Sequence, residues 1–504
     1  MKKLKGLVLL FCLALFANGC GRGFNVEDTV EPNYGLLGQC DRPDLLESTA
    51  LVKEALCGTF SVAEDPDNPD QREIQLHVML LPATSSAARP DPVFFLAGGP
   101  GQSAVDTGVQ IFGQMTELRR ERDVVLVDQR GTGRSNGLNC EWDDNAEALM
   151  YTATEREKHW VRLMQECLDR FSADVAFYTT SLAMDDLNRV REVLGYKQIN
   201  LVGISYGTRA GLVFMRRHGQ SVRSAVFDGV APLSMKIPAN ISIDANDAFA
   251  KVLRDCNAQP ACATSFPDLA SGFSELMERL QEAPEKIEFA HSRTGKVHSA
   301  LIDADIFSGI LRNVLYERTL STLVPFAIEK ARRGDFQPVM ALATMFETET
   351  PIISMGMMAS VLCSEDMRMV DDPNLVGHFS NPIFSQLSPI CDFWPRGNLP
   401  EGFFEPVQSE KPTLLLSGEL DPVTPPRYAL QAMESLPNSQ HVVVAGVGHN
   451  VILQGCLPEI VTEFIDQPMQ AEVDTACLAS LKRKAFFTDY AGPAFPNLGE
   501  AQSD

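Results

Sequence analysis

The chain has 504 residues, of which 45% are hydrophobic and 22% charged, and its formal net charge at pH 7 is −23. This is the composition of a globular protein, and the length suits one large domain with an insertion or two to three domains. The negative charge repels phosphate backbones and argues against nucleic-acid partners. The 12 cysteines show no CxxC or histidine-rich spacing, so we expect no metal site.

The first 19 residues have the pattern of a secretory signal peptide. Three lysines precede an apolar run at 7–17, which is too short to cross a bilayer. The run ends in Asn-Gly-Cys and resembles a lipobox, in which Cys20 would be lipidated. Cleavage by an ordinary signal peptidase is the alternative. We expect a periplasmic outer-membrane lipoprotein whose only membrane contact is this anchor, followed by a tether at 20–39.

Cysteine parity supports export. If Cys12 leaves with the signal peptide and Cys20 carries lipid, the remaining cysteines are even in number, which suits disulfide formation in an oxidising compartment. Pairing between sequence neighbours closes the shortest loops, although connectivity does not follow from sequence alone. The predicted bridges are 40–57, 140–167, 256–262, 363–391 and 456–477.

Short apolar segments then alternate with helical patterns such as 183–195. Several segments are continuous apolar runs, as expected for strands buried on both faces of a parallel sheet. The alternation predicts an α/β fold with a doubly wound, mostly parallel sheet. The predicted strands are 73–82, 93–97, 123–128, 199–204, 224–230, 413–417 and 441–445.

The alternation stops between about 235 and 360, where apolar residues recur at helical spacing. This pattern predicts an inserted, mostly helical cap at 235–360. The cap would divide a core that consists of 40–234 and 361–504.

The stretch NLVGISYGTRAG contains Ser205 between a predicted strand and a predicted helix at 206–218. Gly203 and Gly207 flank the serine by two residues on each side. Gly-x-Ser-x-Gly in this setting is typical of a nucleophile elbow, a sharp turn that lifts the serine hydroxyl above the sheet. The plain alternative is a tight turn that happens to contain a serine.

A serine nucleophile needs a base, an acid and an oxyanion hole. His449 stands in the glycine-rich GVGHN loop after a strand, and Asp421 follows a buried strand in LLLSGELDPVTPP. The order Ser205, Asp421, His449 is the chain order of an α/β-hydrolase triad. Asp228 and Glu419 are rival acids, and we favour Asp421.

The oxyanion hole requires two backbone N–H groups. One would come from Tyr206, the residue after the nucleophile, and the other from the loop after an early strand. The segment FFLAGGPGQSA supplies this loop, and Gly99 is the candidate donor.

Five motifs together resemble the proline iminopeptidase and tripeptidyl aminopeptidase group of α/β-hydrolases. They are the GGPG at 98–101, DQRGTGRS at 128–135, GISYGT around Ser205, LDPVTP around Asp421 and GHN around His449. Ala97 stands where iminopeptidases usually have histidine, and this departure favours the tripeptidyl aminopeptidase side. The resemblance implies a serine aminopeptidase without cofactor that acts on peptides with a free N-terminus.

Such an enzyme needs a negative group for the substrate ammonium. In VLCSEDM the acid shortly after the cysteine is similar to that of family members, so Glu365 is the candidate anchor and Asp366 the second choice. A solvated acidic pair is the alternative. An esterase or lipase of the same fold stays open, since the triad does not distinguish an ester from an amide. A ligand-binding protein on a non-catalytic hydrolase scaffold is the third hypothesis.

Overall fold

The computed structural model describes residues 33–140, 146–345, 353–370, 379, 382–470 and 472–494. A nine-stranded sheet forms the centre, in the order β1-β2-β3-β5-β4-β6-β7-β10-β11. The first three strands and the β3–β5 pair are antiparallel, and the strands from β5 to β11 are parallel. The strands are β1 (Gly38–Gln39), β2 (Leu56–Ala63), β3 (Glu73–Leu81), β4 (Val93–Leu96), β5 (Val124–Val127), β6 (Ile199–Ile204), β7 (Val222–Asp228), β10 (Thr413–Gly418) and β11 (Ser439–Val444).

The predicted doubly wound, mostly parallel sheet is therefore confirmed, and each of the seven predicted strands is present with bounds shifted by two residues or fewer. The first two strands of the sheet, β1 and β2, were not predicted. β1 has only two residues, and the side chains of β2 are exposed or only partly buried, so neither carries a continuous apolar run.

Helices cover both faces of the sheet, and alternate residues of one strand face the two layers. In β4, Phe94 and Leu96 belong to the hydrophobic cluster with α4, α5 and α6, whereas Val93 and Phe95 belong to the cluster with α2, α3 and α16. The core helices are α1 (Thr49–Glu54), α2 (Ala104–Phe112), α3 (Thr116–Glu121), α4 (Ala153–Arg170), α5 (Thr180–Val193), α6 (Tyr206–His218), α13 (Met355–Ser364), α14 (Pro382–Cys391), α15 (Pro426–Met433) and α16 (Leu457–Asp466).

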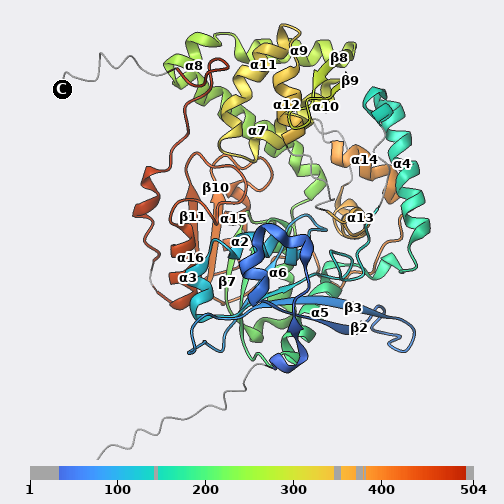
Figure 1. Cartoon of the computed structure of the whole chain (residues 1–504), viewed down its shortest axis with the longest axis vertical. Helices are drawn as coiled ribbons and strands as arrows, with labels where there is room; N and C mark the ends of the chain where they lie inside the picture. The colour runs from blue at the N-terminus through green and yellow to red at the C-terminus, as the bar shows by residue number, and fades with distance from the viewer. Residues whose placement is uncertain are drawn as a thin grey trace, which may run out of the picture.

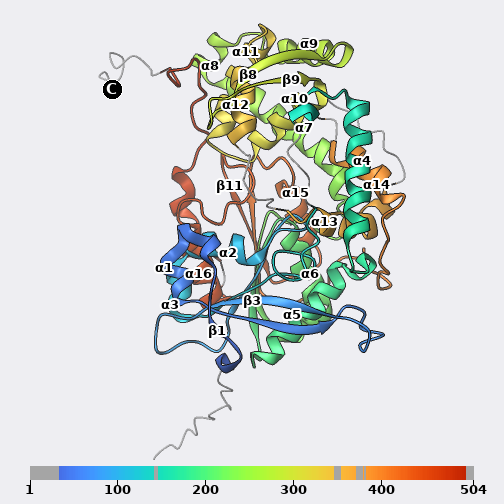
Figure 2. The same ribbon diagram turned by 45° about the vertical axis from the view of Figure 1, so that its right-hand side comes forward.

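A second layer of helices lies at one end of the molecule, beyond β10 and β11 (Figures 1 and 2). It has a hydrophobic cluster of its own. Its elements are α7 (Ile237–Ala258), α8 (Pro260–Ser265), α9 (Leu269–Glu282), β8 (Glu285–Ala290), β9 (Val297–Ile302), α10 (Ala304–Leu315), α11 (Val324–Arg332) and α12 (Gln337–Met345). We call residues 237–345 the cap. The antiparallel hairpin β8–β9 within it was not predicted.

Two predicted boundaries need correction. Residues 38–39, assigned to the tether, form β1, which pairs with β2, and Cys40 is bonded to Cys57 directly after it. At the other boundary, the predicted cap ran to residue 360, but Met357 and Ala359 of α13 pack in the core cluster. The signal peptide at 1–19, Cys20 and the tether up to residue 32 lie outside the described residues.

All five predicted disulfides are present: Cys40–Cys57, Cys140–Cys167, Cys256–Cys262, Cys363–Cys391 and Cys456–Cys477. Such a set is typical of proteins from an oxidising compartment. Over the part of the chain that the structure describes, we find no helix with the length and apolarity needed to span a membrane.

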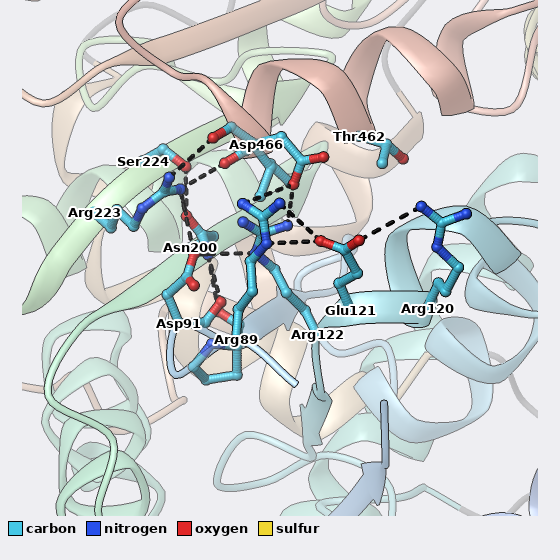
Figure 3. Close-up of polar contacts among 12 residues, drawn as sticks. Arg89, Asp91, Arg120, Glu121, Arg122, Asn200, Arg223, Ser224, Thr462 and Asp466 are labelled. Atoms are coloured by element: carbon cyan, nitrogen blue, oxygen red, sulfur yellow. Dashed lines mark hydrogen bonds and ion pairs between the residues drawn. The ribbon is translucent and has the colours of Figure 1, made fainter. Parts of the chain in front are cut away.

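An ion-pair network joins the amino ends of the parallel strands to the end of α16 (Figure 3). Asp91 Oδ2 accepts hydrogen bonds from Arg122 Nε at 3.0 Å and from Asn200 Nδ2 at 3.0 Å, and it lies 3.3 Å from Arg223 Nη1. Arg122 also pairs with Asp466. Because the acids neutralise the buried Arg122 and the partly exposed Arg223, this network helps to fix the amino ends of the strands, at the edge opposite the candidate site.

Candidate active site

Ser205 lies in a strained turn between β6 and α6. Its φ of 56° and ψ of −124° are unusual for a residue with a side chain, and its N–H donates to the Asp228 carbonyl at 2.8 Å. Gly207 is required beside it, because a Cβ at that position would lie 2.1 Å from the Leu96 carbonyl oxygen. The turn therefore has the geometry of a nucleophile elbow.

His449 and Asp421 are in contact at the carboxyl ends of β11 and β10. His449 Nδ1 lies 2.7 Å from Asp421 Oδ2, and both side chains are buried. Asp421 Oδ1 also accepts the backbone N–H groups of Val423 at 2.9 Å and Thr424 at 2.8 Å. With Nδ1–H donated to the carboxylate, Nε2 of His449 is left as the acceptor for a serine proton.

The two groups shift each other's ionisation. Burial alone would raise the pKa of Asp421, but the charge of His449 and the hydrogen bonds lower it overall. Burial likewise opposes the charged form of His449, yet the adjacent Asp421 raises the His449 pKa above its ordinary value. The pair favours an ionised aspartate that stabilises a protonated imidazole.

Thr424 also contacts the Asp421–His449 pair, and this role was not predicted from the sequence. Its Oγ1 donates to Asp421 Oδ2 at 2.8 Å and lies 3.1 Å from His449 Nδ1. The only indication in the sequence was a hydroxyl residue three positions after the acid, at a spacing that also occurs in ordinary turns.

Asp228 and Gly229 lie between the elbow and the histidine loop. The Asp228 backbone carbonyl holds the amide of Ser205, and its carboxylate Oδ2 accepts the Ile452 N–H at 2.8 Å. A Cβ on Gly229 would lie 2.9 Å from His449 Cε1. Ser205 Oγ makes no hydrogen bond to His449 within the described residues, and in free enzymes this contact is often long and tightens only with substrate.

The rival acids occupy other positions. Asp228 is buried, which raises its pKa to about 6, and its Oδ1 has no hydrogen-bond partner. No hydrogen bond joins Asp228 to His449 in the part of the chain that is described. Glu419 Oε2 accepts the Gly446 N–H at 2.9 Å. Of the three candidate acids, Asp421 alone is hydrogen-bonded to His449.

The predicted oxyanion donors lie around the serine. A Cβ on Gly98 would be 3.2 Å from Ser205 Cβ, so the loop that contains Gly99 packs against the elbow. The Tyr206 N–H is at the amino end of α6, and neither this amide nor that of Gly99 donates to a protein group among the described residues. Both amides are thus free for a ligand oxygen.

Glu365 and Asp366 are fully buried, unlike an exposed acidic pair. Both Asp366 oxygens accept Arg209 Nη1, at 2.9 and 2.8 Å, so the predicted second ammonium anchor is wrong: its charge is already neutralised. Glu365 accepts the N–H and Oγ1–H of Thr180 at 2.8 and 2.9 Å, and burial raises its pKa to about 7. Direct contact between Glu365 and a substrate ammonium has no support in this arrangement.

The cap contacts the histidine loop through Tyr316, which follows α10. The Tyr316 carbonyl accepts the His449 N–H at 3.1 Å, and its ring meets the imidazole edge-on with the ring centres 5.1 Å apart. The two residues are far apart in sequence, so no sequence pattern indicated this contact. Within the described residues, no group of three or more His, Cys, Asp or Glu side chains is arranged to hold a metal ion.

Comparisons with known proteins agree with this fold. Residues 91–262 match the model of the alpha/beta hydrolase fold, and residues 376–477 match that of TAP-like proteins. The chain is 25% identical to serine protease Hip1 of Mycobacterium tuberculosis (strain ATCC 25618 / H37Rv), over 82% of this chain and 85% of that protein. It is 32% identical to carboxylesterase B of the same strain, over 51% of this chain and 54% of that protein.

A third relative is tripeptidyl aminopeptidase of Streptomyces lividans, with 27% identity over 42% of both chains. Named relatives thus include peptidases and an esterase, all hydrolases, and the two matched regions contain the elbow and the Asp421–His449 pair. The chain therefore has the α/β-hydrolase fold and, at residues 376–477, a TAP-like region.

Proposed function

We propose that the protein is a serine exopeptidase that releases N-terminal residues or short peptides from peptides with a free N-terminus. The observation that carries the proposal is the buried Asp421–His449 hydrogen bond beside the strained Ser205 turn. The TAP-like region and the serine protease relative support peptides as substrates.

In the proposed reaction, Ser205 Oγ attacks the substrate carbonyl while His449 Nε2 takes its proton. The developing oxyanion accepts the N–H groups of Gly99 and Tyr206. His449 then protonates the leaving amine, and Asp421 stabilises the imidazolium in between. Water hydrolyses the acyl-enzyme by the reverse proton transfers, and no cofactor takes part.

The test is a matched substrate panel with Ser205→Ala as blank. It contains Pro-, Ala- and Ala-Ala-Pro-anilides with free amines, their N-acetylated forms and a short acyl ester. The proposal predicts cleavage of the free-amine peptides and at least tenfold slower cleavage of the acetylated forms. Equal cleavage of both forms would exclude an aminopeptidase, and the leading free-amine substrate would show whether one residue or a tripeptide is released.

A carboxylesterase is the second candidate, favoured by the 32% identity to carboxylesterase B. Hydrolysis of the ester alone in the same panel would support it.

We also propose that the protein is exported and anchored by lipid at Cys20 on the periplasmic side of the outer membrane. The other ten cysteines beyond the predicted signal peptide are all paired, so Cys20 has no partner among them. Intact mass of the membrane-extracted protein should show a diacylglyceryl group that Cys20→Ser removes. An unmodified mass in the wild type would contradict the anchor.

A further inference from the structure

The cap holds an arginine without a countercharge, one helical turn before the residue that touches His449. Arg312 Nε and Nη1 each expose less than 1 Å² to solvent and have no hydrogen-bond partner. Its Nη2 donates to the side chain of Asn313 at 3.0 Å. No carboxylate pairs with Arg312 among the described residues.

Three other cap arginines each have a carboxylate partner. Arg279 pairs with Glu285 at 2.8 Å, and Arg332 and Arg333 both pair with Glu329. Arg312 is partly buried, and its shielded Nε and Nη1 lose water without gaining an opposite charge, which is costly. Burial accordingly lowers the pKa of Arg312 from its ordinary value. A bound anion would offset this cost.

The helix directs Arg312 toward the candidate site. Arg312 and Tyr316 are four residues apart, and Tyr316 keeps helical backbone angles at the end of α10, so the two side chains share one face. Tyr316 packs on His449 along that face. Arg312 therefore lies about one helical turn, roughly 5 Å along the axis, beyond the residue that contacts His449.

The leaving group departs from this side of the site. In the proposed function, on which this inference rests, His449 protonates the leaving amine, so the leaving peptide starts beside His449. Each extended residue spans about 3.3 Å, so a leaving peptide of two or three residues would extend past Tyr316 to the Arg312 guanidinium. The group at its end is a carboxylate, for which a guanidinium is a strong partner.

We propose that Arg312 binds the C-terminal carboxylate of the leaving peptide, and that the protein is selective for short oligopeptides with a free C-terminus. The enzyme would thus prefer substrates whose leaving peptide is of the length that places its terminal carboxylate at Arg312. Longer chains and C-terminal amides lose this contact.

The test uses Ala-Ala-Pro-Ala-Ala as free acid and as C-terminal amide, with cleavage followed by mass spectrometry. For the wild type, kcat/KM for the acid should exceed that for the amide by about tenfold or more, as expected for one charge-assisted hydrogen bond. Arg312→Gln should bring the ratio near one, Arg312→Lys should keep part of it, and Arg293→Gln, which removes an exposed cap cation, should leave it unchanged.

Rates on Ala-Ala-Pro-anilide, which has no carboxylate, report any general loss of activity in the variants. If both peptides are cut at equal rates by the wild type, the inference is wrong although the proposed function stands. If neither peptide nor anilide is cut but the acyl ester is, both are wrong. The wild-type ratio decides the question even if Arg312→Gln does not fold.

Discussion

Thr424 Oγ1 lies between the two partners of the Asp421–His449 pair, 2.8 Å from the carboxylate and 3.1 Å from the imidazole nitrogen. Its hydroxyl holds the carboxylate in the orientation that accepts Nδ1–H. The amide of the same residue donates to the other carboxylate oxygen at 2.8 Å. One residue therefore fixes both oxygens of the acid.

Thr424→Val should lower kcat by about 5- to 30-fold, since one hydrogen bond to a charged group is lost and the shape is kept. Thr424→Ser retains the hydroxyl and should stay within about threefold of wild type. Steady-state rates on the best substrate of the panel provide the measurement. A loss in Thr424→Ser as large as that in Thr424→Val would contradict the role of the hydroxyl, because serine keeps it.

Substitutions at Asp421 and Asp228 test which of the two residues is the catalytic acid. Asp421→Asn should reduce kcat by about 10³- to 10⁴-fold with little change in thermal stability, because the imidazole loses the acceptor that orients and charges it. Asp228→Asn, which keeps an acceptor for the Ile452 N–H, should cost far less. A larger loss for Asp228→Asn would identify Asp228 as the catalytic acid.

The pH profile follows from the raised pKa of His449. His449 must be neutral to take the serine proton, so kcat/KM should rise with pH through its pKa, which lies above the ordinary 6.5. In Asp421→Asn the residual kcat/KM should rise over a lower pH range, since the anion that favours the imidazolium is gone. A rise over the same pH range in both proteins would show that Asp421 does not raise the His449 pKa.

Glu365 gives a pH dependence of stability. Its folded pKa of about 7 lies above the ordinary value of 4.5, so the folded state binds more protons between these values. The free energy of unfolding should therefore decrease as pH rises from about 4.5 to 7. Glu365→Gln removes this contribution, and denaturant unfolding at pH 5 and pH 8 should show a smaller difference than in wild type.

The same variant tests the predicted ammonium anchor. From the buried contact with Thr180 we expect Glu365→Gln to change kcat/KM for free-amine and N-acetylated substrates by the same factor. A rise in KM confined to free-amine substrates would show that Glu365 contacts the ammonium after all.

The Arg209–Asp366 pair should act on stability. Asp366→Ala leaves a buried guanidinium without its carboxylate and should cost about 3–5 kcal/mol. The double variant Asp366→Leu with Arg209→Met removes both charges and should recover part of the loss. Thermal unfolding of the wild type and the two variants measures this, and a double variant no more stable than Asp366→Ala would argue against a charge-pair origin.

The sequence predicted the parallel strands because four of them, β4, β5, β6 and β10, are buried along their whole length and are therefore largely apolar. It could not predict the hairpin β8–β9, in which β8 alternates only weakly between buried and exposed positions. The elbow and its partners follow strand ends, where local patterns are informative. Arg209, Thr180 and Tyr316 contact their partners only in the folded chain, because these partners are distant in the sequence. No local sequence pattern therefore indicated that Glu365 and Asp366 are buried.

Covalent labelling of Ser205 tests the central claim most directly. The wild-type protein is treated with a fluorophosphonate, digested and analysed by mass spectrometry, with Ser205→Ala and His449→Ala as controls. The account predicts a single adduct on the peptide that contains Ser205, none in Ser205→Ala and strongly slowed labelling in His449→Ala. An adduct on another residue, or full peptide hydrolysis by Ser205→Ala, would contradict it.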